Sequence, residues 1–100
     1  MGRNKVGDVV MVTRMSNGKL VWLETGNATA GLTHITTRHA GHFAARGITD
    51  IPSFLHRTLQ TSPINTGIKA SRPFAEFSVS GNMYRVAHGT NGFIVTFYPI

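Results

Sequence analysis

The chain has 100 residues, enough for one domain with a single modest hydrophobic core. Ten Lys and Arg face four Asp and Glu, giving a net charge of +6 with histidine neutral. This surplus favours a polyanion such as RNA or DNA, or an acidic protein, as partner. Cysteine is absent, which excludes a thiol nucleophile, a thiolate zinc site and a disulfide framework. We expect residues 1–100 to form a single domain.

The sequence disfavours two further classes of protein. No apolar run is long enough to span a bilayer, and residues 1–5 lack the apolar stretch of a signal peptide, so export would have to be directed from outside this chain. Two-metal nucleases usually need clustered carboxylates to hold Mg²⁺. The acidic residues here are far apart in the sequence: Asp8, Glu24, Asp50 and Glu76. A two-metal nuclease is therefore not expected.

A β-hairpin is predicted near the N-terminus. Residues 9–13 and 19–24 are rich in β-branched and apolar side chains, and Ser16-Asn17-Gly18 lies between them. Asn-Gly is a strong hairpin signal because both residues of the turn need a positive φ. Gly26-Asn27-Ala28 then ends the second strand.

Two helices are predicted next. The first runs over about residues 31–46 and stops at Gly47. The second has Thr49 as its predicted N-cap and Pro52 in its first turn, and Ser62-Pro63 ends it. Its apolar residues recur at helical spacing and should face the core: Ile51, Phe54, Leu55 and Leu59.

The rest of the chain predicts an antiparallel sheet. Residues 64–72 are ambiguous between loop and strand. Turn-like segments separate the three predicted strands, which are 74–79, 83–87 and 93–98. A hairpin, two helices and a meander, in that order, predict an α+β fold with helices packed on one face of the sheet.

The first predicted helix carries the residues best suited to catalysis. Histidine exchanges protons near neutral pH, and an arginine beside it can hold a phosphate. On a helical wheel with His34 at 0°, Arg38 falls at about 40°, His42 at about 80°, and His39 at about 140° among apolar residues. We therefore expect His34 and Arg38 to face a cleft. His39 is expected to be half-buried and to orient a neighbour by a hydrogen bond.

Two other interpretations of the histidines stay open. His34, His39 and His42 could ligate zinc, although their i, i+5, i+8 spacing does not share one helix face. Any single histidine could also be a surface or core residue without a chemical role. This is the interpretation we prefer for His42, His56 and His88.

The last predicted strand carries two hydroxyl groups. Side chains alternate along a strand, so Phe93, Val95 and Phe97 should share the face that packs on the helices. Thr96 and Tyr98 would then lie side by side on the open face, where they could donate hydrogen bonds to a phosphate oxyanion. Both residue types are also simply good strand formers.

Basic and aromatic residues of the same half could extend a nucleic-acid-binding face. Lys69, Arg72 and Arg85 could neutralise backbone phosphates. Phe74 and Tyr84 could stack on bases, or could belong to the core.

Two motifs resemble a known group of toxin nucleases. One is Gly31-Leu32-Thr33-His34-Ile35 followed by Arg38-His39, with Gly47-Ile48 downstream. The other is the ending NGFIVTFYP at residues 91–99. Together they resemble the barnase/EndoU/colicin/RelE group, which includes C-terminal toxin domains of contact-dependent growth inhibition systems and colicin D-like tRNases. The resemblance covers roughly residues 8–100 and implies the α+β fold of that group.

The resemblance implies a metal-independent endoribonuclease that needs no cofactor. In this group a base takes the proton of a ribose 2′-OH, which attacks the adjacent phosphate. An acid protonates the leaving 5′-oxygen, and a 2′,3′-cyclic phosphate remains. By this resemblance His34 is the acid or base, Arg38 binds phosphate or orders the helix, and His39 is a second proton carrier. Thr96 and Tyr98 stabilise the developing charge or position the phosphate.

One departure leaves the second catalytic group open. Some colicin D-like enzymes carry a lysine shortly before the catalytic histidine, whereas this chain has Ala30, Gly31, Leu32 and Thr33. Lys69, Arg72 or Tyr98 could fill that role.

The resemblance also implies a biological setting. The substrate would be RNA, with tRNA the first expectation, and an acidic immunity protein would complement the basic surface. The domain would be exported as the tail of a larger toxin and act in the cytoplasm of the target cell. Two alternatives stay open: a non-catalytic nucleic-acid-binding module, and a ribosome-dependent, mRNA-cleaving toxin of a toxin–antitoxin pair.

Overall fold

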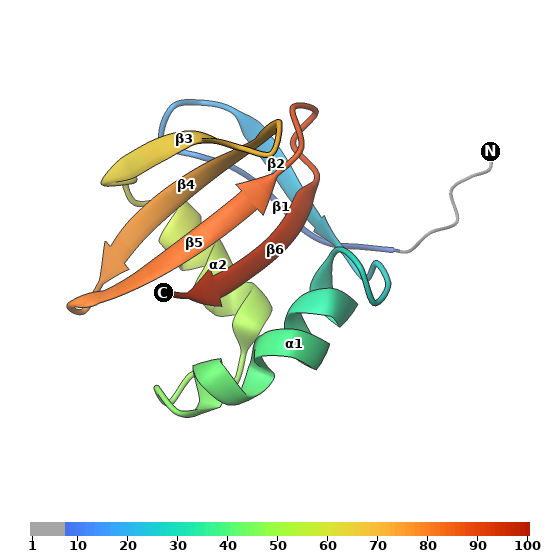
Figure 1. The fold of residues 1–100 in the computed structure, drawn as a ribbon, viewed down its shortest axis with the longest axis vertical. Coiled ribbons are helices and arrows are strands. Elements are labelled where there is room, and N and C mark those ends of the chain that lie inside the picture. The colour runs from blue at the N-terminus through green and yellow to red at the C-terminus, as the bar shows by residue number, and fades with distance from the viewer. Residues whose placement is uncertain (1–7) are drawn as a thin grey trace.

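The computed structural model describes residues 8–100 and shows an α+β fold with two helices and two antiparallel sheets (Figure 1). The N-terminal stretch 1–5 lies outside the described residues. The elements in chain order are β1 (Val9–Arg14), β2 (Leu20–Glu24), α1 (Leu32–Ala44), α2 (Ile51–Leu59), β3 (Asn65–Lys69), β4 (Arg72–Val79), β5 (Asn82–His88) and β6 (Ile94–Pro99). The predicted α+β class, hairpin and meander are confirmed, and the ambiguous segment 64–72 contributes strand β3.

The N-terminal hairpin forms a sheet of its own, anchored to the start of β6. The backbone N–H of Trp22 donates to the carbonyl of Gly92 at 3.0 Å, and Trp22 and Phe93 form a short parallel bridge. Gly92 has a φ of 105°, and a Cβ there would lie 2.3 Å from the Leu20 carbonyl oxygen. Only glycine allows the hairpin backbone to approach this turn so closely.

The second sheet has the order β3-β4-β5-β6, and its inner face holds the core. Figure 1 shows α2 behind this sheet and α1 alongside β6. Phe43 of α1 packs 5.1 Å from Phe97 of β6, and Phe54 of α2 packs 5.0 Å from Tyr84 of β5, measured between ring centroids. All four rings are buried. Burying one such ring stabilises the fold by roughly 1.5–3 kcal/mol, so this cluster fixes both helices on the sheet.

Helix α2 begins one residue later than predicted. Its N-cap is Asp50 rather than Thr49, and the Asp50 carboxylate accepts the backbone N–H of Ser53 at 3.1 Å. A carboxylate suits this position because it also interacts favourably with the positive end of the helix dipole. The predicted core residues of α2 are all buried: Ile51, Phe54, Leu55 and Leu59. Neither helix of the described part of the chain is long and apolar enough to cross a membrane.

Strand β6 does not alternate as the sequence predicts. Ala87 pairs with Thr96, whereas His88 pairs with Ile94, so Val95 is an extra residue at a register shift. The bulge interrupts the alternation, and Ile94 rather than Val95 joins Phe97 in the core. The prediction that Phe93, Val95 and Phe97 share the inner face is therefore wrong, while Thr96 still lies on the open face together with Tyr98.

The bulge also attaches α1 to the sheet. The backbone N–H of Gly31, the N-cap of α1, donates to the Val95 carbonyl at 2.9 Å. Gly31 has a φ of 88°, and a Cβ there would lie 2.8 Å from the Glu24 carbonyl oxygen. Helix α1 therefore starts at a glycine wedged between β2 and β6.

This contact predicts the effect of Gly31→Ala. The added methyl meets backbone, and the left-handed conformation costs further energy, so we expect the free energy of unfolding to fall by at least about 2 kcal/mol. Urea denaturation measures the change. Gly41→Ala is the matched control, because Gly41 lies within α1 with open space around its Cα. That variant should gain up to about 1 kcal/mol, and equal effects of the two variants would contradict the close contact at Gly31.

Candidate active site

A row of four polar side chains crosses the open face of the large sheet. Asn65 lies opposite Glu76, Glu76 opposite Arg85, and Arg85 opposite Tyr98 on successive antiparallel strands. The Asn65 amide donates to Glu76 Oε1 at 3.0 Å, and Arg85 Nε donates to Glu76 Oε2 at 2.8 Å. Arg85 Nη2 binds the same oxygen, and Arg85 Nη1 donates to the Tyr98 hydroxyl at 3.5 Å. Directly opposed pairs thus connect all four strands.

Glu76 and Arg85 hold each other in the charged state. Glu76 is 8% exposed, and hydrogen bonds from Asn65 and Arg85 lower the pKa of its carboxylate. The hydrogen bond to Glu76 raises the pKa of Arg85. The guanidinium is therefore a fixed cation with one edge on Glu76 and one N–H directed to Tyr98.

Helix α1 adds an imidazole to the end of this row. The His39 ring stacks on the Tyr98 ring, with 5.1 Å between centroids and 24° between planes. His34 and His42 flank His39 at 6.0 and 5.5 Å between centroids, and His39 Nδ1 lies 3.3 Å from His42 Nδ1. The expected hydrogen bond from His39 to a neighbour is therefore present, and its partner is His42.

The surroundings of His39 favour its neutral form. Partial burial lowers the pKa of His39 most, followed by the nearby charges of His42, His34 and Arg38. A histidine whose pKa is lowered from 6.5 is largely unprotonated at neutral pH. His39 is thus able to accept a proton there.

A hollow of about 230 Å³ lies beside Tyr98 on the open face. Ala70, Phe74 and Ala87 form part of its lining. The other lining side chains carry a positive charge or a hydroxyl group: Lys69, Arg72, Arg85, Thr96 and Tyr98. The Thr96 hydroxyl oxygen is buried and has no hydrogen-bond partner within residues 8–100. A buried hydroxyl without a partner costs about 1–3 kcal/mol.

The structure brings most of the predicted site residues together at this hollow. Thr96, Tyr98, Lys69, Arg72 and Arg85 line it, and His39 stacks on its rim. The helical wheel favoured His34 and Arg38 for the cleft, but the imidazole in contact with Tyr98 belongs to His39, because α1 lies alongside β6. His34 Nδ1 instead lies 3.0 Å from the Ala28 carbonyl oxygen, and Arg38 is exposed.

Tyr84 and Phe74, the two aromatic residues predicted to stack on bases or to belong to the core, lie on opposite faces of the sheet. Tyr84 is a core residue, 2% exposed. Phe74 lies at the hollow, with the Arg85 guanidinium carbon 4.8 Å from its ring centroid. Phe74 is therefore the one of the pair that a ligand in the hollow could contact.

Two residues of the row, Glu76 and Asn65, are not among the site residues predicted from the sequence. A signal for Glu76 was present: a hairpin that turns at Ser80-Gly81 places residues 76 and 85 opposite each other, since both lie equally far from the turn. The position of Asn65 depends on strand β3, which the sequence left ambiguous. Its contact with Glu76 was therefore not accessible from the pattern.

The histidines do not assemble a metal site. Among residues 8–100, no group of three or more His, Cys, Asp or Glu side chains is arranged to hold a metal ion. His39 and His42 bring their Nδ1 atoms together, whereas His34 Nδ1 lies against the Ala28 carbonyl oxygen.

No protein-family model matches the sequence, and no curated protein shows significant similarity to it. The site must therefore be interpreted from its own geometry.

The ion pair predicts a pH dependence of stability. The pKa of Glu76 is lowered in the folded protein from 4.5, so the pair contributes stability above pH 4.5 that is lost as the pH falls through the lower folded value. Glu76→Gln should therefore lower Tm at pH 7 and approach the wild type in acid. Thermal unfolding between pH 3 and pH 7 measures this. Asp8→Asn, at an exposed carboxylate, is the control, and a Glu76→Gln deficit that stays constant with pH would contradict the pairing.

Proposed function

We propose that this chain is a metal-independent endoribonuclease of the barnase/EndoU/colicin/RelE kind, a toxin domain with tRNA as the first substrate to test. The observation that carries the proposal is the stack of His39 on Tyr98 at the rim of the cationic hollow. It combines a proton acceptor, hydroxyl donors and fixed cations, which are the groups that phosphodiester cleavage requires. The order of hairpin, two helices and meander also supports the resemblance.

In the proposed reaction, neutral His39 accepts the proton of a ribose 2′-OH. The 2′-oxygen forms a bond to phosphorus while the bond from phosphorus to the 5′-oxygen breaks. The Tyr98 hydroxyl gives its proton to that 5′-oxygen, and the products are a 2′,3′-cyclic phosphate and a 5′-hydroxyl. The proton held by His39 then returns to the Tyr98 phenolate. Tyr98 suits this role because it accepts the Arg85 N–H and so keeps its own hydrogen for donation.

The remaining residues of the hollow would bind the phosphates. The Thr96 hydroxyl and Arg85 would stabilise the negative charge that develops on the non-bridging oxygens, and Glu76 holds Arg85 in place before the substrate arrives. Lys69 and Arg72 would hold neighbouring phosphates of the RNA. Phosphate would give the Thr96 hydroxyl the partner that it lacks.

His34 and Arg38 then act on His39 rather than on the substrate. Their charges lower the pKa of His39, which keeps the base ready near neutral pH. This assignment moves the central role from His34, which the sequence favoured, to His39. The open face would also be the surface that an acidic immunity protein covers until the toxin reaches the cytoplasm of a target cell.

The first functional prediction concerns the histidines. His39→Ala should lower the cleavage rate by about 10²–10⁴-fold, the usual contribution of a general base. His34→Ala should lower the cleavage rate by a smaller factor. It should also move the acidic limb of the pH–rate profile to higher pH, because it removes a charge that lowers the pKa of His39. Cleavage of purified tRNA between pH 5 and pH 8 measures both effects.

His56→Ala is the matched control, because His56 is exposed on α2 away from the hollow. Cleavage by His39→Ala at the wild-type rate would contradict the assignment of His39 as the general base. Tight RNA binding without cleavage by the wild type would favour a binding module. Cleavage that requires ribosomes would favour a toxin of the toxin–antitoxin type.

A second prediction separates function from folding at Thr96. Thr96→Val keeps the shape of the side chain and removes a buried hydroxyl without a partner, so stability should stay the same or rise by up to about 1 kcal/mol. The cleavage rate should fall by about 10²-fold, as when one oxyanion donor is lost. Urea denaturation and tRNA cleavage on the same preparation measure the two effects. Unchanged cleavage would show that the Thr96 hydroxyl does not contact the substrate.

A further inference from the structure

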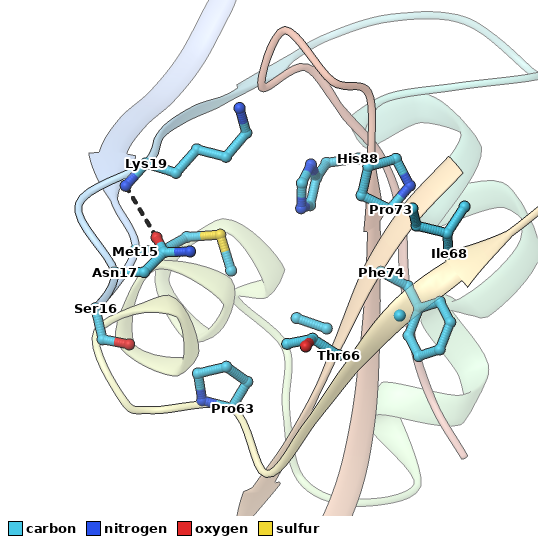
Figure 2. Close-up of a pocket in the computed structure, with 12 residues that line it drawn as sticks. Met15, Ser16, Asn17, Lys19, Pro63, Thr66, Ile68, Pro73, Phe74 and His88 are labelled. Carbon is cyan, nitrogen blue, oxygen red and sulfur yellow. Dashed lines mark hydrogen bonds between the residues drawn. The ribbon is translucent and has the colours of Figure 1, made fainter. Parts of the chain in front are cut away.

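A second cavity lies at the opposite face of the large sheet, between the β1–β2 turn and strands β3 and β4 (Figure 2). Its volume is about 320 Å³. We call it the His88 pocket, because the imidazole of His88 faces into it (Figure 2). The mechanism proposed above uses none of the polar side chains that line it.

His88 is a buried polar residue with one nitrogen open to the pocket. It is 6% exposed, and its Nδ1 lies 2.8 Å from the Gly89 carbonyl oxygen. Because a carbonyl only accepts, Nδ1 carries the hydrogen, and Nε2 of the neutral ring is an acceptor. Within residues 8–100 no group hydrogen-bonds Nε2. The pocket therefore presents an acceptor to which a ligand N–H or O–H can donate.

The rim of the pocket supplies hydrogen-bond donors. The Lys19 ammonium donates to the Thr90 carbonyl at 2.8 Å, which leaves two of its three hydrogens for another partner. Asn17 accepts the backbone N–H of Lys19 through its Oδ1, so the Asn17 amide N–H₂ group also remains available. Lys19 is the charged residue among those that line the pocket, and the rim therefore suits an anion.

Apolar side chains form much of the wall of the pocket. Pro63 and Pro73 lie on opposite sides of the space, Met15 lies next to Asn17, and Ile68 lies at the edge beside Pro73 (Figure 2). Ile68 is 74% exposed, so the pocket is open to solvent on that side. Such walls accept a planar heterocycle with little loss of hydrogen bonding.

We propose that the His88 pocket binds one nucleotide of the RNA substrate, with an amino group of its base donating to His88 Nε2 and its phosphate beside Lys19. The inference rests on the proposed function, because it takes RNA as the substrate. Adenine, cytosine and guanine carry an exocyclic amino group, whereas uracil presents a carbonyl oxygen at the same position as the cytosine amine. The pocket should therefore discriminate against uracil.

The test uses CMP and UMP as matched probes on the ¹⁵N-labelled full chain. In an NMR titration, CMP should shift the amide signals of Asn17, Lys19 and His88, and UMP should bind there about tenfold more weakly. Ile68→Glu places a negative charge at the edge of the pocket and should weaken CMP binding by about tenfold. Ile64→Glu is the control, because Ile64 is also exposed but does not line the pocket.

The outcomes separate this inference from the proposed function. Shifts confined to the hollow of Thr96 and Tyr98, or equal binding of CMP and UMP at the pocket, would overturn the inference. CMP binding at the pocket together with intact tRNA would contradict the nuclease and leave a nucleotide site. Cleaved tRNA with no shift at Lys19 or His88 would contradict the pocket alone.

Discussion

The hydrogen bond from the Gly31 N–H to the Val95 carbonyl is the contact on which the candidate site depends. Val95 is the extra residue at the register shift of β6, so its carbonyl is available to a segment outside the sheet. The bond fixes the first residue of α1 against β6, and the Phe43–Phe97 contact fixes the helix further along. Between these two anchors lies His39, which can stack on Tyr98 because the helix cannot slide along the strand. A local irregularity of one strand thus determines which histidine reaches the hollow.

The hollow is rigid on one side and incomplete on the other. Asn65, Glu76 and Arg85 satisfy one another, so the cation that meets Tyr98 has little freedom to move. The Thr96 hydroxyl, by contrast, has no partner in the described residues. A fold selected for stability alone would favour valine at this position, since the shape is the same and no hydroxyl is desolvated. A fixed network beside an unsatisfied hydroxyl is what a site prepared for a ligand should look like.

Much of this arrangement was predictable from the sequence. The hairpin, both helices and three strands follow from periodicity and turn residues, and alternation correctly placed Thr96 and Tyr98 on the open face. The helical wheel favoured His34 over His39 for the cleft, because it contains no information on how α1 lies against β6. The bulge at Val95 leaves no signal in the hydrophobic pattern, so the inner face of β6 was assigned to the wrong residues. The spacing of the carboxylates in the sequence does not indicate a role for Glu76, because its contact with Arg85 depends on the pairing of β4 with β5.

The edge strand β3 suggests how one RNA could use both faces of the sheet. Ile68 and Lys69 are consecutive, so their side chains point to opposite faces, Ile68 to the His88 pocket and Lys69 to the hollow. A nucleic-acid strand that crosses the edge of β3 would pass from the hollow to the His88 pocket around the outside of the sheet. Only a flexible single strand can make such a turn, because bending a duplex is costly. The two proposals together therefore favour an unpaired loop of RNA over a helical segment as the substrate, in keeping with the way proteins read RNA sequence from splayed bases.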